Sequence, residues 1–203
     1  TIPRARTKVR QTVRLKVLPT ARRKAKKTAN HRMRKKAKAS SMHEKLITAT
    51  IGYDKGDPKR IQHFIKVHSF AKLIGVCEGL PDDAMKVLET AAVLHDIGIH
   101  EGERLYGRND GQIQQELGPG IAAQIMDAVG GYDDVKERVM YLIAHHHTYT
   151  GIDSKELQIL IEADFIVNLY EDGASPVAVK SAYESIFVTE SGKRVLKDCF
   201  GIK

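Results

Sequence analysis

The chain of 203 residues is 42% hydrophobic and carries 33 Lys and Arg against 25 Asp and Glu. It has no apolar run near 18 residues, which argues against a membrane span, and its two cysteines fit no metal-binding spacing. Such a length favours one domain, alone or with an appendage, and the cysteines indicate ordinary thiols in a reducing compartment, so we expect a cytoplasmic protein.

Residues 1–41 form a basic leader that differs from the rest of the chain. They hold 16 of the Lys and Arg and none of the acids, so the remaining 162 residues have 17 basic and 25 acidic groups, a formal charge of −8. Self-repulsion and the scarcity of large apolar side chains predict that the leader is disordered or only loosely helical.

Three roles for this leader are open. It could bind nucleic acid or an anionic membrane, it could be a targeting presequence, or it could lie outside the working protein, with translation starting at Met42. We favour the last, which makes 42–203 the functional domain and limits any contact with nucleic acid to 1–41. His31 and His43 are then expected to be solvated and without a role.

From residue 58 onward the sequence is a succession of helical periods without the sustained alternation of a half-buried strand, which predicts an all-α fold. Gly102, Gly107 and Gly111 dot the stretch 99–116, which we expect to be a loop that covers the substrate. The segment 176–203 either completes the core or forms a dimer contact, so a homodimer is possible. The expected helices span about 58–77, 81–98, 120–128, 133–147, 155–170 and 176–187.

Ionisable side chains fall on the apolar faces of four of these helices. At 100° per residue His63, His95 and His146 each align with buried positions, as does Asp164, while His145 lies just off the line. Unpaired buried carboxylates cost several kcal/mol each, and only Arg60 is placed to pair with them. A shared divalent cation accounts for the whole set.

The order of these residues resembles the HD-domain phosphohydrolase superfamily over nearly all of 58–170. The resemblance rests on four elements: "RIQHFIKVHSFAK", the His-Asp doublet in "AAVLHDIG", the run "IAHHHTYTG" and the aspartate in "LIEADFIVNL". It implies an HD-domain helical bundle with a first metal ion on His63, His95, Asp96 and Asp164. His145 and His146 would bind a second ion or instead contact phosphate, and both alternatives stay open.

The donor set suits Mn²⁺, Fe²⁺, Co²⁺, Mg²⁺ or Zn²⁺, as one or two ions. The resemblance implies a metal-dependent phosphohydrolase that cleaves an ester or anhydride of a small phosphorylated metabolite, most plausibly a nucleotide, through a metal-activated water. Asp96 or Asp164 would orient or deprotonate that water, and His145 or His146 would protonate the leaving oxygen. The candidate phosphate contacts are Arg60, Lys66, Arg104 and Arg108.

The chain departs from one branch of that family and admits a second kind of function. Where the cyclic-dinucleotide-hydrolysing branch has a histidine four residues before a glycine, this chain has Gln114 before Gly118. It also lacks that branch's Gly-Tyr-Pro motif, which argues against such a substrate. The alternative function is a metal-stabilised nucleotide-binding sensor or interaction module without turnover.

Overall fold

The computed structural model describes His31, Met33 and residues 42–202. The chain divides into two compact units, Thr1–Ala39 and Ser40–Lys203. Of the leader, only His31 and Met33 are described, and both are helical and exposed. The expectation that residues 1–41 are disordered therefore lies outside the described residues.

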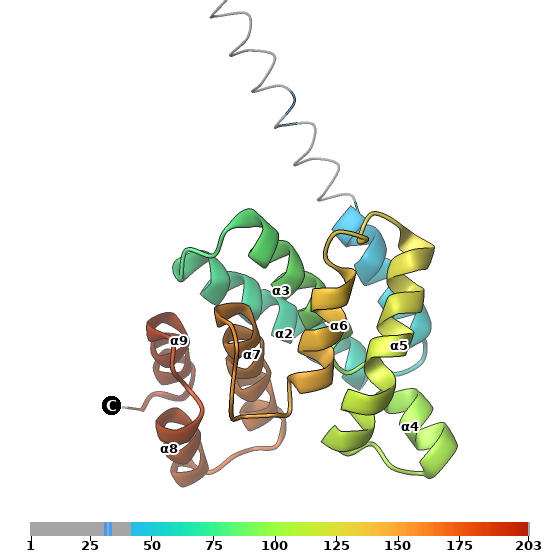
Figure 1. Ribbon diagram of the computed structural model, residues 1–203. Coiled ribbons are helices and arrows are strands. Elements are labelled where there is room, and N and C mark those ends of the chain that lie inside the picture. The colour runs from blue at the N-terminus through green and yellow to red at the C-terminus, as the bar shows by residue number, and fades with distance from the viewer. Residues whose placement is uncertain (1–30, 32, 34–41, 203) are drawn as a thin grey trace, which may run out of the picture. The chain divides into compact units, whose positions relative to one another are not determined.

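The second unit consists of helices, and its described residues include no strand, which confirms the all-α prediction (Figure 1). A first helical stretch covers 42–53. The helices that follow are α2 (Pro58–Cys77), α3 (Asp82–Leu94), α4 (Ile99–Tyr106), α5 (Gly111–Val129), α6 (Lys136–His145), α7 (Lys155–Glu171), α8 (Pro176–Ser185) and α9 (Glu190–Phe200).

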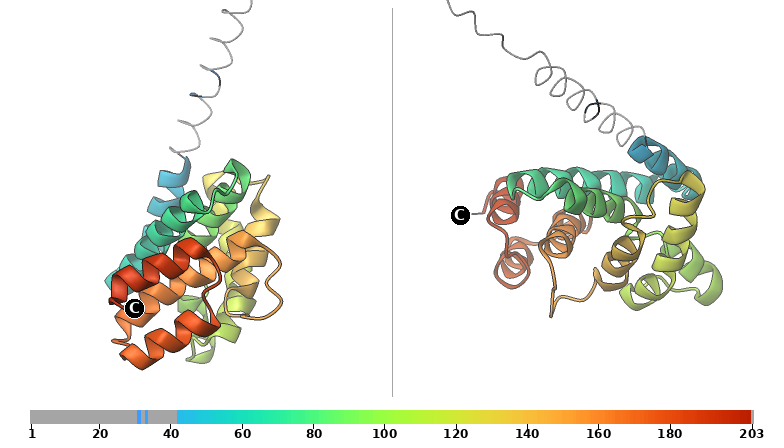
Figure 2. Two further views of the ribbon diagram at one scale, coloured as in Figure 1. Left: turned by 90° about the vertical axis from the view of Figure 1, so that its left-hand side faces the viewer. Right: turned by 45° about the horizontal axis from the view of Figure 1, so that its top comes forward.

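The helices pack around α2, α3 and α7. The first of these lies against both of the others, while α6 joins α3 to α5. Helices α8 and α9 lie at the end of the unit opposite α4 and α5, which can be followed in Figure 1 and in the views of Figure 2. Ten residues of α7 are buried, so this helix is enclosed on nearly all sides. Any polar group that it carries inward must find its partner within the protein.

Local sequence signals start several helices. Asp57 accepts a hydrogen bond from the backbone of Arg60, and Pro58 occupies the first turn of α2. Ser154 caps α7 in the same way through the backbone of Leu157. Such caps satisfy backbone N–H groups that lack an intrahelical partner, and they fix where the site-bearing helices begin.

The prediction of a loop over 99–116 is wrong, because α4 and the start of α5 occupy it. A Cβ atom added at Gly102 would lie 2.6 Å from the side chain of Ile113 and 2.8 Å from the carbonyl of Arg108. This glycine therefore permits close packing rather than a turn. Among the three glycines of this stretch, Gly107, with φ +64°, is the one that ends a helix in the left-handed region. Helix α5 also continues through Pro119 instead of starting beyond it.

The folded pattern begins earlier than residue 58. The helical stretch 42–53 buries Leu46 and Thr50 completely. His43 is half-buried, and its Nε2 atom lies 2.9 Å from Nε2 of His68 on α2. The expectation that His43 is solvated is thus wrong, because its helix docks against the bundle.

The C-terminal helices complete the core. Val179 and Leu196 are buried, and α9 packs against α2, α7 and α8. The fully buried carboxylate of Glu162 on α7 accepts hydrogen bonds from the backbone N–H groups of Val188 and Thr189, at 2.7 and 2.9 Å. The side chains of Gln158 and Thr189 donate to it as well. The segment before α9 therefore holds α7 in place.

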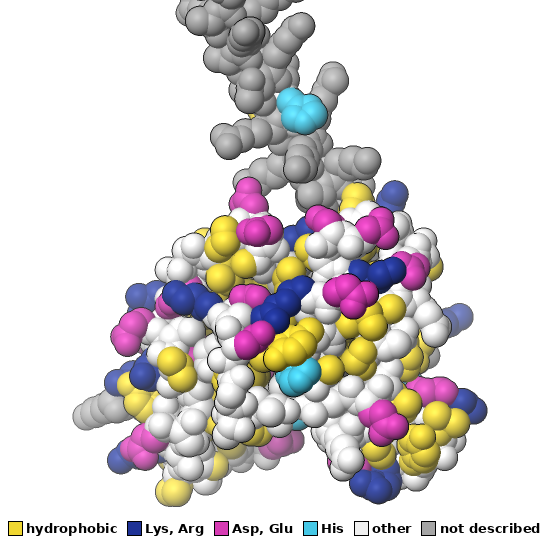
Figure 3. Space-filling view, in the orientation of Figure 1, with side chains coloured by type: hydrophobic (Ala, Val, Ile, Leu, Met, Phe, Trp, Pro, Cys, Tyr) yellow, Lys and Arg dark blue, Asp and Glu magenta, His cyan; other side chains and the backbone are white. Residues whose placement is uncertain are grey.

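None of the described helices combines the length and apolar character needed to cross a bilayer. Basic and acidic side chains are interspersed over the face of residues 42–202 that Figure 3 shows. That face therefore lacks the broad basic surface that is typical of nucleic-acid binding.

Candidate metal centre

Four helices bring ionisable side chains together in the interior. His63 lies within α2, and His95 and Asp96 follow the last residue of α3. His146 follows α6, and Asp164 lies within α7. All except Asp96 are less than one-tenth exposed, whereas the Asp96 side chain is 23% exposed. The expected convergence of these residues is therefore present.

The donor atoms are spaced as they would be around a shared ion. The Nε2 atoms of His63 and His95 are 3.2 Å apart, and Oδ1 of Asp164 lies 3.2 Å from the former and 3.5 Å from the latter. Oδ2 of Asp96 lies 3.4 Å from the first nitrogen and 3.5 Å from the second. Tetrahedral ligands about 2.0–2.2 Å from an ion are roughly 3.3–3.6 Å from one another.

The outer nitrogens fix the tautomers of both rings. Nδ1 of His95 donates to the carbonyl of Ala92 at 3.0 Å, and Nδ1 of His63 donates to Oε2 of Glu171 at 3.2 Å. When both rings are neutral, neither Nε2 atom carries a proton, and the lone pairs of the two atoms face each other. Such a contact requires a positive species between them, a proton or a metal ion.

The titration of these groups reflects the same demand for positive charge. Burial alone would lower the pKa of His95, but Asp96 and Asp164 raise it to about 9. Burial alone would raise the pKa of Asp96, yet the charge of His95 and the ring of His146 lower it to about 2. The pKa of Asp164 is lowered in the same way, against the effect of burial, by hydrogen bonds with His63 and His95.

His146 extends the centre beyond the first group of donors. Its Nδ1 donates to the carbonyl of Ile143 at 2.7 Å, so Nε2 is the bare nitrogen. That atom is buried and makes no hydrogen bond to any described residue, but it lies 3.5 Å from Oδ1 of Asp96. Ligand atoms of Asp96, His146 and His147 all lie within 4.8 Å of one another. Asp96 therefore belongs to two donor groups, either of which could hold an ion.

Two further side chains of α7, those of Asn168 and Glu171, orient Asp164 and His63. Nδ2 of Asn168 donates to Oδ1 of Asp164 at 2.9 Å, and Lys66 Nζ lies 2.5 Å from Oε1 of Glu171. Asn168 and Glu171 follow Asp164 by four and seven residues, so they lie on the same face of α7. This spacing is the sequence signal that could have identified Glu171, which we did not single out.

A polar cavity of about 260 Å³ opens onto this centre. Five carboxylates border it, against the two cationic side chains of Lys59 and Arg60. An anionic substrate would therefore meet net repulsion unless a metal ion reversed the local charge. The cavity is lined by Asp57, Lys59, Arg60, His63, Asp96, Ile99, Asn109, Gln114, His147, Asp164, Asn168, Glu171 and Asp172.

The sequence matches no protein-family model and no curated protein. The structure is similar to the crystal structure, at 1.45 Å resolution, of a predicted HD superfamily hydrolase from an uncultured Thermotogales bacterium. The similarity covers 78% of this chain and 84% of that chain, with 23% sequence identity and a TM-score of 0.56. The chain has the HD-domain fold. The fold that the sequence resemblance implied is thereby confirmed.

In the run of three histidines, 145–147, the expected pair of His145 and His146 does not form a donor group. His145 is half-buried, its ring stacks on Tyr141 with centroids 4.0 Å apart, and its Nδ1 donates to the Tyr141 carbonyl. It belongs to none of the donor groups found among the described residues. His147, the next residue after the expected pair, lines the cavity. The chain leaves α6 after His145, so the helical angle no longer gives the direction of His147.

Gln114, the position at which the chain departs from the cyclic-dinucleotide branch, contacts His147. Its Nε2 donates to the carbonyl of Asn109 at 2.7 Å, which turns Oε1 toward Nε2 of His147 at 2.9 Å. Because an amide oxygen only accepts, His147 carries its proton on Nε2 and leaves Nδ1 bare. Burial, together with the neighbouring ring of His146, lowers the pKa of His147 to about 4.

The candidate phosphate contacts lie at different places in the HD fold. Arg60 borders the cavity, paired with Asp57 at 2.8 Å and with Glu103 at 2.6 Å. Arg104 and Arg108 are about two-thirds exposed, pair with neighbouring acids on α4 and the following turn, and do not line the cavity. Lys59, which the sequence analysis did not select, does line it.

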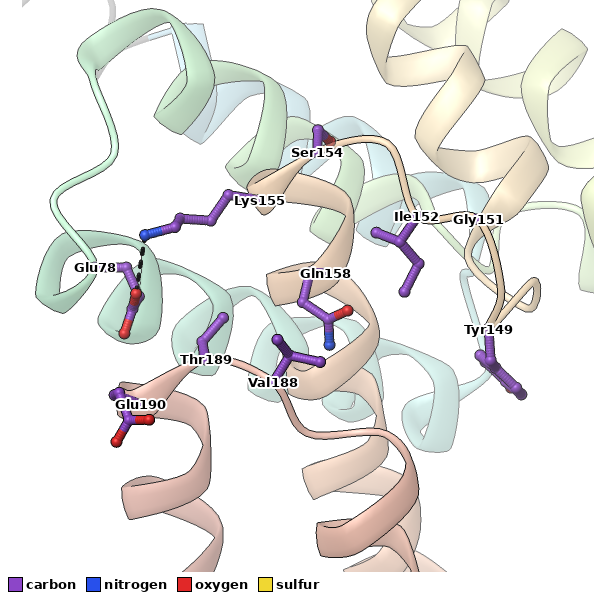
Figure 4. Close-up of a pocket in the computed structure, with 10 residues that line it drawn as sticks. All are labelled: Glu78, Tyr149, Gly151, Ile152, Ser154, Lys155, Gln158, Val188, Thr189 and Glu190. Carbon is purple, nitrogen blue, oxygen red and sulfur yellow. Dashed lines mark hydrogen bonds and ion pairs between the residues drawn. The ribbon is translucent and has the colours of Figure 1, made fainter.

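A roomier cavity of about 600 Å³ lies away from these donors (Figure 4). Tyr149, Ile152 and Val188 give it an apolar lining, and Lys155 pairs with Glu78 at its edge. None of the metal-centre side chains borders it. The converging donor side chains therefore border the smaller cavity and not this one.

Proposed function

We propose that the chain is a metal-dependent phosphohydrolase that acts on a small phosphorylated metabolite, most plausibly a nucleotide. The observation that supports it best is the close approach of the Nε2 atoms of His63 and His95, which face each other beside Asp96 and Asp164 and require a positive species between them. The HD superfamily hydrolase with the same fold supports the hydrolase class.

The proposed chemistry combines an ion with residues that hold the substrate. An ion bound to His63, His95, Asp96 and Asp164 would act as a Lewis acid toward a phosphoryl oxygen and would activate a water. Lys59 and Arg60 are the cavity's cationic side chains and would bind the remaining phosphoryl oxygens. Helix α2 fixes the backbone of both residues, and the ion pairs of Arg60 with Asp57 and Glu103 hold its guanidinium beside the cavity.

Asp96 is the carboxylate best placed to orient the attacking water. It borders the cavity, belongs to both donor groups and is partly exposed, whereas Asp164 is buried under the amide of Asn168. His147 is neutral at pH 7 and has a bare Nδ1, so it would serve as a ligand of a second ion rather than as an acid. The sequence-based roles of His145 and His146 as proton donors gain no support from this arrangement.

The cavity limits how much of the substrate can be enclosed. Its volume of about 260 Å³ is below the roughly 300–1,000 Å³ of pockets that enclose whole drug-sized ligands. We infer that it holds the phosphoryl end of the substrate, while the rest extends outward past α4. A site that encloses only the phosphoryl group would accept substrates that differ in their leaving group.

The test uses the full chain, stripped with a chelator and then reloaded with Mn²⁺, Co²⁺ or Zn²⁺. Phosphate release is measured with p-nitrophenyl phosphate, sugar phosphates and nucleoside mono- and triphosphates. Asp96→Ala should abolish release, while Asp133→Ala, at an exposed aspartate outside the cavity, should leave it unchanged.

Two other results would replace this proposal. A thermal shift with nucleotides but no phosphate release under any ion would favour the metal-stabilised sensor. Full activity of the chelated protein would exclude a metal-dependent mechanism.

A further inference from the structure

Three ionisable side chains form a second cluster on other parts of the molecule. His43 lies on the helical stretch 42–53, His68 on α2 and Glu89 on α3. His68 follows His63 by five residues, a rotation of about 140° around the helix, so the two rings leave α2 in different directions. The cluster is thus separate from the HD metal centre.

The three donor atoms face one another. Nε2 of His43 lies 2.9 Å from Nε2 of His68, which lies 3.2 Å from Oε2 of Glu89. The remaining separation, from His43 Nε2 to Glu89 Oε2, is 3.8 Å. A tetrahedral zinc ion with ligands at about 2.0–2.1 Å needs these atoms roughly 3.3–3.4 Å apart, so small rotations of the side chains would suffice.

The protons of this cluster leave room for a cation. Two imidazole nitrogens 2.9 Å apart cannot both carry a proton, so at least one of them presents a lone pair. Burial, and next the neighbouring His68, lower the pKa of His43 to about 4, which keeps that ring neutral at pH 7. A neutral imidazole is the form that binds metals.

The cluster is partly exposed to solvent. The side chains of His43, His68 and Glu89 are 19%, 13% and 17% exposed. Two histidines and one glutamate, with a fourth position open to water, are a known donor set for zinc. Imidazole and carboxylate together also accept Co²⁺, Ni²⁺ and Cu²⁺.

Lys72 competes with a cation for the carboxylate. Its Nζ lies 2.9 Å from Oε2 of Glu89, and its side chain is 55% exposed, so it can turn into solvent at little cost. Among the described residues, every hydrogen bond and ion pair of Glu89 uses Oε2, which leaves Oε1 available to an ion. Removal of the Lys72 charge should therefore strengthen metal binding.

We propose that His43, His68 and Glu89 form a second cation site, for Zn²⁺ or an ion of similar chemistry, that fastens the helix 42–53 to α2 and α3. An ion held there would stabilise the docked helix by mass action, because the three donors come together only in the folded protein. The site would thereby control the segment that directly follows the basic leader in the sequence.

The experiment measures zinc binding to the full chain in a background that removes the HD centre. Asp96→Asn with Asp164→Asn provides this background, and circular dichroism verifies that each variant is folded. Zinc content is measured by elemental analysis after dialysis, and affinity by competition with a chromophoric chelator. We expect one zinc to remain in the double variant.

Variants of the cluster then separate the outcomes. His43→Gln should weaken the remaining site by more than the about 10–100-fold lost when an outer-shell partner of a metal ligand is removed. Lys72→Met should strengthen it, and His31→Gln, at an exposed histidine, should change nothing. If His43→Gln and Lys72→Met leave zinc affinity unaltered, the proposal is wrong.

A second readout does not depend on the double variant. In the otherwise unaltered chain, zinc should slow hydrogen exchange of the amides in 42–53, and His43→Gln should remove this protection and lower the zinc content by one ion. Equal zinc content and equal protection in both proteins would overturn the site even if the HD centre binds metal normally.

Discussion

Glu171 holds the imidazole of His63 in the tautomer that turns Nε2 toward Asp164. Its Oε2 lies 3.2 Å from Nδ1 of His63, while Lys66 occupies its other oxygen. The carboxylate therefore orients a proposed metal ligand and is not itself one of the four proposed donors.

Glu171→Gln should weaken metal binding about 10–100-fold, as is typical when an outer-shell partner of a ligating histidine is removed. Titration calorimetry with Mn²⁺ or Zn²⁺ measures the change. Glu116→Gln removes one negative charge from an exposed position on α5 and serves as the control. Equal losses in both variants would attribute the effect to net charge rather than to the orientation of His63.

The metal-free protein should lose stability as the pH rises from about 6.5 to about 9. The folded-state pKa of His95 is raised to about 9, so its favourable pairing with the two aspartates is complete below the unfolded value and disappears above the folded one. One pKa unit corresponds to about 1.4 kcal/mol, which limits the loss to a few kcal/mol. Thermal unfolding in chelator at pH 6 and pH 9 tests this.

Added metal should weaken that dependence of stability on pH. An ion bound by His63 and His95 would take the place of the proton between the two imidazoles, so metal binding would release protons and become tighter as the pH rises. The unfolding temperature with saturating Zn²⁺ should therefore fall less between pH 6 and pH 9 than it does in chelator. A steeper fall with zinc present would contradict the placement of the ion between His63 and His95.

Gly98→Ala should destabilise the protein by about 1–3 kcal/mol through overpacking. The added Cβ would lie 2.9 Å from the backbone nitrogen of Gly118 and 3.1 Å from the carbonyl of Gln114, and backbone cannot move aside as a side chain can. Because Gly98 follows Asp96 by two residues, metal affinity should fall as well. Urea unfolding and metal titration measure the two effects.

Gly120→Ala is the matched control for that substitution. Gly120 lies inside α5, and an added Cβ would meet nothing within 4 Å. Alanine is favoured over glycine in a helix by roughly 0.5–1 kcal/mol, so this variant should be more stable than the parent chain. Destabilisation by both alanines would point to helix α5 itself rather than to the contact of Gly98 with Gly118.

His147→Gln should remove the second ion if one binds, whereas His145→Gln should not. The first residue shares a donor group with Asp96 and His146, while the ring of the second stacks on Tyr141. Metal content at saturation, measured for both variants and the parent chain, decides between the pair implied by the resemblance and the pair that the geometry favours.

Helical periodicity predicted which ionisable side chains meet in the interior. His63, His95 and Asp164 lie on faces whose apolar neighbours are buried, so the angle of each side chain around its helix was enough to direct it inward. His147 escaped this reasoning because it follows the end of α6, where the backbone direction depends on the packing of the next segment.

The glycines of 99–116 were misread for a related reason. A sequence shows that a residue lacks a side chain, but it does not show whether the chain turns there or whether another helix approaches closely. At Gly102 another helix approaches closely, and only the three-dimensional structure shows that Ile113 lies beside this glycine. His43 was missed similarly, since its partners follow 25 and 46 residues later in the chain.

The anchoring of Glu162 has a consequence for shortened forms of the chain. Loss of the residues from 188 onward would take away the backbone donors of a carboxylate that is wholly enclosed, on the same helix as Asp164. Proteolytic trimming of that end would then destabilise α7 and shift Asp164, although it removes none of the proposed metal ligands. The intact segment 188–203 would therefore be needed to keep α7 in position, and its loss by proteolysis would be irreversible.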